Sequence, residues 1–140
     1  MKVSYWARVL LQLIAVLGLT AGCASPPIHA VNSFVTDYQS LVYGKRTPKS
    51  TFTQADTIRF LVDLQWDDPK KDAGFHDVKW NWYSNGQLIS TGGREFHFKH
   101  TPYELWGVKQ ASALGTGDFK VDLLVDGQIM ATQTFSITAQ

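Results

Sequence analysis

The chain has 140 residues, of which 44% are hydrophobic and 18% charged, so it suits one globular domain and is not broadly disordered. Its formal net charge of +1 gives no basic footprint for nucleic acid or for anionic lipid headgroups, and we expect no nucleic-acid partner. A single cysteine, Cys23, excludes an internal disulfide bond.

The N-terminal segment has the layout of a cleavable secretion signal. Lys2 and Arg8 flank the start of an apolar run over residues 9–19, which has one polar interruption, Gln12. The run is too short for a membrane-spanning helix, which needs about 17–25 residues. We therefore predict a signal peptide over residues 1–22.

Residues 19–23, Leu-Thr-Ala-Gly-Cys, resemble the lipobox of bacterial lipoproteins, although Thr20 stands where that family usually has Leu. The resemblance implies a diacylglyceryl thioether on Cys23, cleavage after Gly22, and acylation of the new amino group by a chain such as palmitate. Several acyl chains give stable anchoring, whereas one binds only marginally. Ala24, in place of the Asp that favours inner-membrane retention, implies an outer-membrane lipoprotein facing the periplasm.

A short tether is expected between this anchor and the folded part of the chain. Two adjacent prolines, Pro26 and Pro27, cannot lie within a helix and favour extended geometry. We assign residues 23–31 to the lipidated cysteine and tether, and residues 32–140 to one domain.

Alternation of apolar and polar residues with a period of two runs through the domain and is typical of strands with one buried face. Trp66, Trp80 and Trp82 fall on the apolar side of this pattern, so we expect them in the core. The predicted strands cover residues 33–43, 57–66, 76–84, 87–91, 94–99, 118–125 and 128–138.

Turn signals lie between several of these strands. Asn85-Gly86 and Asp126-Gly127 suit type I′ hairpin turns because Asn, Asp and Gly tolerate positive φ. Gly92-Gly93 indicates another bend. Thr101-Pro-Tyr-Glu104 has the pattern of a helix capping box, which predicts a short helical turn near 101–106.

About seven short strands without a long amphipathic helix predict an all-β, antiparallel β-sandwich. Residues 114–127 resemble the penultimate strand and last hairpin of bacterial immunoglobulin-like domains, with Phe119 at an aromatic position of that pattern. The turn near 101–106 fits the E–F crossover of such domains. The resemblance, over about residues 55–138, implies an immunoglobulin-like fold but no particular function, since this sandwich hosts many activities.

The residues that could carry catalysis do not converge in the predicted fold. A zinc site needs three or four ligands, but His97 and His100 would point to opposite faces of their strand. Lysines interrupt the acidic loop 67–74 and oppose a calcium ion. Glu95 and Glu104 have no predicted position across a cleft from each other. We expect no catalytic residue, no metal, no cofactor and no enzyme activity.

Aromatic residues outside the predicted core suggest binding instead. Tyr83 lies opposite the apolar face of its strand, whereas Tyr103 and Trp106 lie at the predicted corner, and these three are possible contacts for a ligand or partner. The leading prediction is a lipid-anchored, non-catalytic binding or assembly module with a protein partner in the cell envelope. A glycan- or peptidoglycan-binding module is one alternative. A small metal-dependent hydrolase near His76, Asp77 and His97 is another.

Overall fold

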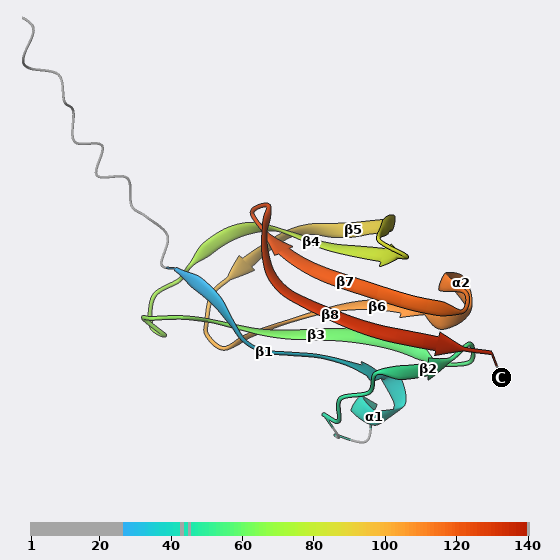
Figure 1. Cartoon of the computed structure of the whole chain (residues 1–140). Coiled ribbons are helices and arrows are strands. Elements are labelled where there is room, and N and C mark those ends of the chain that lie inside the picture. Colours follow the sequence, from blue (N-terminus) through green and yellow to red (C-terminus); the bar gives the residue numbers. More distant parts are fainter. Residues whose placement is uncertain (1–26, 43, 45, 140) are drawn as a thin grey trace, which may run out of the picture.

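Two sheets packed face to face make up the part of the chain that the computed structural model describes, residues 27–42, 44 and 46–139 (Figure 1). The elements are β1 (Ile28–Asp37), α1 (Tyr38–Val42), β2 (Thr51–Thr53), β3 (Thr57–Trp66), β4 (Gly74–Ser84), β5 (Gln87–Phe98), β6 (Tyr103–Gln110), α2 (Ala111–Leu114), β7 (Gly117–Val125) and β8 (Gln128–Thr138).

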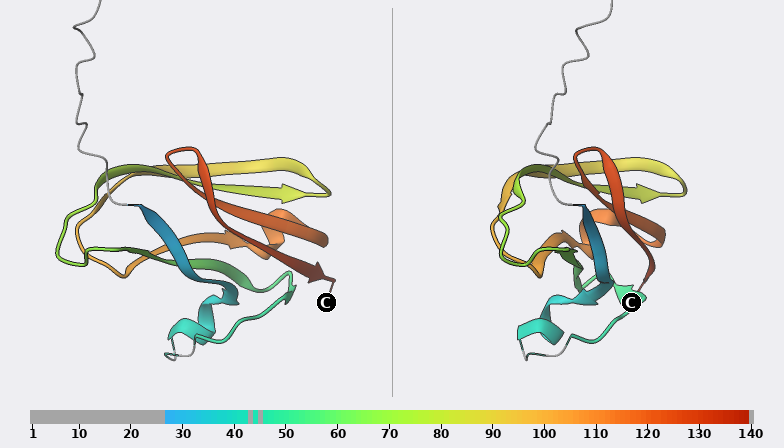
Figure 2. Two further views of the ribbon diagram at one scale, coloured as in Figure 1. Left: turned by 60° about the vertical axis from the view of Figure 1, so that its left-hand side comes forward. Right: turned by 90° about the vertical axis from the view of Figure 1, so that its left-hand side faces the viewer.

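The sheets have three and five strands, in the orders β1-β3-β6 and β2-β8-β7-β4-β5. Every pairing is antiparallel except that of β2 with β8, which is parallel. Figure 2 shows the two layers from the side. The prediction of an all-β sandwich is therefore confirmed, with eight strands in the described residues and one parallel pair that the sequence pattern did not indicate.

The core lies between the sheets and is built by the predicted alternation. From β3, Ile58, Phe60, Val62 and Leu64 are fully buried. Trp66, Trp80 and Trp82 are only 3%, 8% and 2% exposed, which confirms their expected core positions. Full burial of one such apolar side chain stabilises the fold by about 1.5–3 kcal/mol, so the alternating strands fix the sandwich through the apolar surface they remove from water.

Both predicted hairpin turns are present. Asn85 and Gly86 have φ of 49° and 79°, and Asp126 and Gly127 have φ of 50° and 80°. Positive φ at both central residues is the requirement of a type I′ turn, whose twist matches the flanking strands. The dipeptides therefore fix the β4–β5 and β7–β8 connections.

The predicted helical turn at 101–106 is wrong. Residues from Tyr103 onward form β6, which pairs with β3 in the register Leu64–Tyr103 and Val62–Leu105. A helical turn here would leave the backbone N–H and C=O groups on this side of β3 without hydrogen-bond partners. The extended conformation pairs them and also buries the Leu105 side chain. Glu104 does not cap a helix but forms an ion pair with Arg46.

The bend predicted at Gly92-Gly93 is also absent. Strand β5 runs without a break from Gln87 to Phe98, and Gly92 and Gly93 pair with Trp80 and Lys79 of β4. The two predicted strands 87–91 and 94–99 are therefore one long edge strand. Its backbone pairing outweighs the low strand propensity of two consecutive glycines.

The start of the domain differs from the prediction as well. Strand β1 begins at Ile28, so residues 28–31 of the predicted tether belong to the sheet. Ile28 and Ala30 pack against the core and pair with Trp66 and Leu64. The predicted strand 33–43 ends at Asp37, whose carboxylate accepts the Ser40 N–H at 2.7 Å and starts α1. Residues 1–22 and Cys23 lie outside the described part of the chain.

In the described residues, no helix is both long and apolar enough to span a bilayer.

Candidate functional site

A groove of about 480 Å³ lies between β5 and β6, the edge strands of the two different sheets. Figure 2 shows β5 (yellow) in one layer and β6 (orange) in the other. The residues that line the groove include four aromatic and two charged ones, together with Gly93 and Leu105: Trp80, Phe96, Tyr103, Trp106, Arg94 and Glu104. It gathers more aromatic rings than any other hollow described in the structure, so we take it as the candidate binding site.

Trp80 forms the floor of this groove. Its ring reaches from β4 to β6, where a Cβ atom on Gly107 would lie 2.5 Å from ring carbon Cδ1. The indole N–H is buried and has no hydrogen-bond acceptor among the described residues. An unsatisfied buried donor costs about 1–3 kcal/mol, and this one lies against Gly107 inside the domain.

Phe96 and Arg94 form the wall on the β5 side. The Phe96 ring meets Trp80 edge-to-face, with centroids 6.0 Å apart, and the Arg94 guanidinium lies 4.7 Å from the Phe96 ring centre. Arg94 is exposed and makes no ion pair within the described residues, whereas Glu104 is paired with Arg46. The groove therefore offers one unpaired positive charge.

Tyr103 and Trp106 line the β6 side. Tyr103 packs against Phe98, with ring centroids 4.7 Å apart. Trp106 is half exposed, and the Arg59 guanidinium lies 4.6 Å from the centre of its ring. The two residues that the sequence pattern placed at a corner are thus brought together in one groove, but by a strand rather than by a helical turn.

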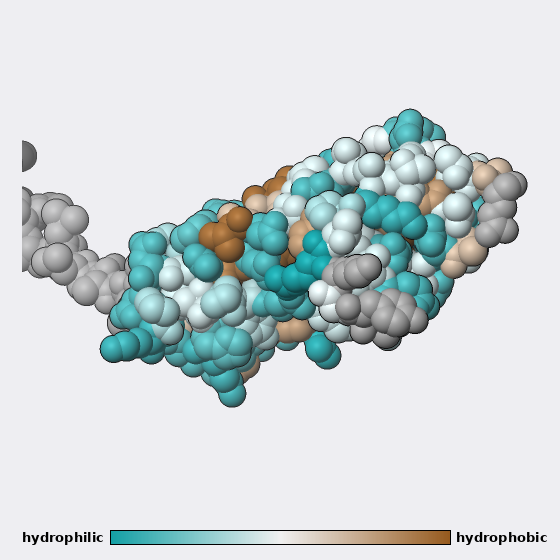
Figure 3. Space-filling view, turned by 90° about the horizontal axis from the view of Figure 1, so that it is seen from below, coloured by the Kyte–Doolittle hydropathy of each residue, from teal (hydrophilic) through white to brown (hydrophobic). Residues whose placement is uncertain are grey.

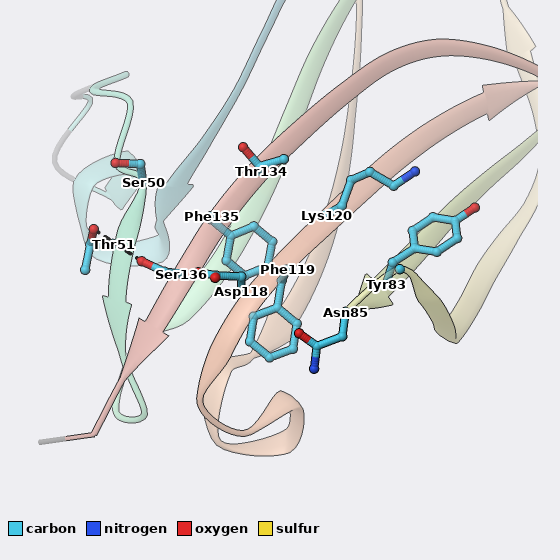
Figure 4. A pocket seen from close by; sticks show the side chains of 11 residues that line it. Ser50, Thr51, Tyr83, Asn85, Asp118, Phe119, Lys120, Thr134, Phe135 and Ser136 are labelled. Atoms are coloured by element: carbon cyan, nitrogen blue, oxygen red, sulfur yellow. Dashed lines mark hydrogen bonds between the residues drawn. The ribbon is translucent and has the colours of Figure 1, made fainter.

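Tyr83 does not join them. It borders a separate, shallow hollow of about 490 Å³, where Lys120 lies 4.1 Å from the centre of its ring. Figure 4 shows Tyr83 and Asn85 on one side of this hollow and Ser50 and Thr51 on the other. The structure therefore separates Tyr83 from Tyr103 and Trp106, and covers one face of the Tyr83 ring.

Sequence reasoning missed Arg94 and Phe96 as site residues, and it assigned Trp80 to the core alone. Trp80 is buried as expected, but it also lines the groove. The missed signal was the long strand through Gly92-Gly93, which continues β5 past Trp80 and carries Arg94 and Phe96 into position.

The underside of the sandwich offers no comparable apolar surface. Figure 3 shows a mostly hydrophilic face with a small brown area. Among the described residues, the large exposed hydrophobic side chains are divided between the edge strands β5 and β6 (Leu88, Ile89, Trp106 and Val108) and separate positions elsewhere (Val31, Tyr38, Phe75 and Ile129). Single exposed apolar residues of this kind are normal on a soluble domain.

The histidines considered for a metal site make structural contacts. In the buried His76 ring, Nδ1 lies 2.6 Å from the Asp126 carboxylate and Nε2 lies 3.0 Å from the Ala73 carbonyl oxygen. His97 contacts the Asp72 carboxylate at 2.7 Å, and Asp77 pairs with Lys79 at 2.8 Å. Within the described ranges, no three potential metal ligands come together.

Asp126 joins the β7–β8 turn to the first residues of β4. Burial alone would raise the pKa of its carboxyl, but hydrogen bonds from His76 and from the Asp77 backbone N–H outweigh this effect and hold the pKa below its usual value. The carboxyl is therefore ionised at neutral pH and keeps both oxygens as acceptors. This cluster fixes a turn and a strand, and it leaves both His76 nitrogens occupied.

Two solved structures are similar in fold to this chain. An immunoglobulin-like protein from Pseudomonas aeruginosa superposes with a TM-score of 0.54 at 8% sequence identity, over 82% of this chain and 99% of that one. The fold is immunoglobulin-like. The alkylpurine DNA glycosylase AlkC from Pseudomonas fluorescens, in complex with DNA containing an abasic site analog, gives a TM-score of 0.53 at 12% identity over 83% of this chain.

This chain spans only 32% of the length of AlkC. No family model matches the sequence, and no curated protein matches it. At such low identities the two likenesses establish the fold and carry no activity across. The immunoglobulin-like expectation is thus confirmed for the sandwich, and function has to be argued from the groove.

Proposed function

We propose that this chain is a lipid-anchored, non-catalytic binding module of the bacterial cell envelope, which holds its ligand in the groove between β5 and β6. The observation that carries the proposal is the gathering of four aromatic residues and the exposed Arg94 around one groove between two edge strands. Convergent polar and aromatic groups in a concave site are typical of ligand binding. The groove lacks a nucleophile paired with a base, and its one carboxylate, Glu104, is held by Arg46.

The anchor part of the proposal places Cys23, with its acyl chains, in the outer membrane and the domain on the periplasmic side. Only residues 24–27 separate Cys23 from the first residue of β1. Five peptide steps span at most about 18 Å, so the sandwich would stay close to the bilayer. Strand β1 starts at the end of the sandwich that holds the β5–β6 connection (Figure 1). The Tyr103 end of the groove would therefore face the membrane side.

Replacing Cys23 with serine should release the protein from the membrane. Serine cannot form the thioether, and the multiple acyl chains that give stable anchoring are then missing. Fractionation of cells should find wild type with the membranes and Cys23→Ser in the soluble fraction, with an unchanged circular dichroism spectrum. Ala24→Ser is the matched control and should remain membrane-bound. A membrane-bound Cys23→Ser protein, together with wild type that carries no acyl group, would refute the anchor.

The groove itself can be tested in living cells with a photo-reactive phenylalanine analogue at position 106. Trp106 is 50% exposed at the groove rim, so an occupant should be close enough to crosslink. Phe75, which is 65% exposed and does not line the groove, is the matched control position. We expect a discrete adduct from position 106 and none from position 75. Equal adducts from both positions, or none from position 106, would count against the groove.

A glycan is the alternative occupant, because half-exposed Trp106 could stack on a sugar ring. The faces of the other rings are less available. Arg94 lies over Phe96, Phe98 packs against Tyr103, and Arg59 already covers one face of Trp106. Few flat aromatic faces remain open, and this weighs against a sugar as the main ligand.

A further inference from the structure

We propose that the groove binds an extended polypeptide segment that pairs with the free edge of β5 at Gly92-Gly93 and places an acidic side chain against Arg94. The inference rests on the proposed function for the location of the site, and it adds the chemical class of the ligand. The partner segment would act as an additional strand beside β5.

The first observation is that the domain does not need a glycine at position 92. Gly92 lies in the interior of β5, its φ is not in the left-handed region, and a Cβ atom there would have no other atom within 4 Å. Glycine in a strand interior weakens the strand and often marks a close approach by a ligand or another backbone. Cross-strand pairing with Trp80 places the missing side chain on the same face of β5 as the Trp80 ring, next to Gly93, which lines the groove.

The neighbouring glycines differ from Gly92 in this respect. A Cβ atom on Gly93 would overlap the Val78 carbonyl, and one on Gly107 would meet the Trp80 ring. Those two glycines are explained by packing inside the domain. Gly92 therefore stands out as a bare backbone position of an edge strand, beside the groove, that internal packing does not explain.

The second observation is the unpaired edge itself. Strand β5 pairs with β4 on one side, and no other described strand pairs with it. A long edge strand with free N–H and C=O groups is a template for strand addition, a common mode of peptide recognition. Lys109 of β6 donates to Ser90 of β5 at 2.8 Å beside the groove, and this contact lies before Gly92 in the chain. The stretch from Gly92 to Phe96 remains accessible beyond it.

The third observation is the charge of the groove. Arg94 points to the same side of β5 as Gly92 and has no ion-pair partner within the described residues, and the nearby carboxylate of Glu104 is taken by Arg46. A guanidinium binds a carboxylate through two parallel hydrogen bonds, which fixes both charge and direction. The unpaired guanidinium of Arg94 therefore selects a segment with an acidic residue.

The experiment selects a displayed library of random peptides, each about ten residues long, on the full-length protein in detergent micelles. We expect the enriched peptides to contain an acidic residue. Their affinity should fall about tenfold or more in Gly92→Val, whose side chain fills the open space beside Trp80 that a side chain of the segment would occupy, and in Arg94→Gln. Thr91→Val and Lys79→Gln, which lie on the other face of the sheet, should bind as wild type does. Gly92→Val should melt no lower than wild type, since its side chain meets open space.

A second measurement separates strand addition from simple occupancy of the groove. On binding of an enriched peptide, amide hydrogen exchange along β5 should slow at alternate residues, because new backbone hydrogen bonds form along the free edge. Slowed exchange only at the backbone amides of other groove residues, with no change along β5, would overturn the strand-addition inference.

The remaining outcomes distinguish failure of this inference from failure of the proposed function. Failure to enrich any peptide, or peptides that bind Gly92→Val and Arg94→Gln as tightly as wild type, would overturn the inference. If peptidoglycan fragments bind instead, and Arg94→Gln weakens them, the groove remains the site and the peptide ligand is wrong. If neither class binds and position 106 gives no crosslink in cells, the proposed function fails with the inference.

Discussion

Replacing Phe98 with alanine is expected to destabilise the domain by about 3–5 kcal/mol, the usual cost of removing a fully buried phenylalanine. Phe98 is 0% exposed at the end of β5. Its ring stacks on His76 and Trp66, with centroid distances of 4.7 Å and 6.2 Å, and packs against Tyr103 at 4.7 Å. One side chain therefore joins β3, β4, β5 and β6, and its loss opens a cavity among four strands.

Thermal unfolding followed by near-ultraviolet circular dichroism measures this effect, since the aromatic cluster dominates that signal. Phe75→Ala is the matched control, because Phe75 is 65% exposed and stacks only on His97. It should cost less than about 1 kcal/mol. Phe98→Ala should also displace Tyr103 and reduce crosslinking from position 106. Similar melting temperatures for the two variants would show that the cluster does not hold the groove in place.

Local sequence patterns predicted much of this fold because each acts over a few residues. Asn85-Gly86 and Asp126-Gly127 fix their turns through backbone freedom alone. Alternation in 57–66 fixes which face of β3 is buried, whatever strand lies opposite. These elements needed no knowledge of their partners, and the structure has them as predicted.

The errors arose where a distant partner decides the conformation. Thr101-Pro-Tyr-Glu104 has a good local helix signal, yet β3 offers an unpaired edge about 40 residues earlier in the chain and extends this segment into β6. Gly92-Gly93 likewise has the composition of a bend, but pairing with β4 on one side keeps it extended. Sequence alone could not supply either neighbour.

The groove was only partly predictable for the same reason. Tyr103 and Trp106 were identified as possible contacts, but the residues that complete the site come from two other strands. Arg94 and Phe96 reach the groove only because β5 is continuous. Trp80 was correctly assigned to the core, and for that reason it was not considered as a site residue. Tyr83 lies apart from the other two, beside a different hollow, and the sequence alone does not show how far apart two strands lie in the fold.

The two adjacent glycines of β5 provide the sharpest energetic contrast in the chain. Gly93→Ala is expected to destabilise the domain by about 1–3 kcal/mol or more, since overpacked positions carry that cost. The added Cβ would overlap the Val78 carbonyl and lie 2.8 Å from the Lys79 Cα, and neither backbone atom can move without breaking the β4–β5 pairing. Gly92→Ala should instead stabilise the strand by about 0.5–1 kcal/mol, because alanine loses less conformational entropy than glycine on folding.

Thermal unfolding of the two variants beside wild type measures the contrast, and each variant is the matched control for the other. The same added methyl group, one residue apart, should lower the melting temperature at position 93 and raise it at position 92. Destabilisation of similar size at both positions would mean that Gly92 is required by the domain itself, which would remove the main argument for a partner backbone beside β5. Opposite effects on the melting temperature would mean that the fold tolerates a side chain at position 92. The glycine there would then have a role other than folding, at the free edge of β5.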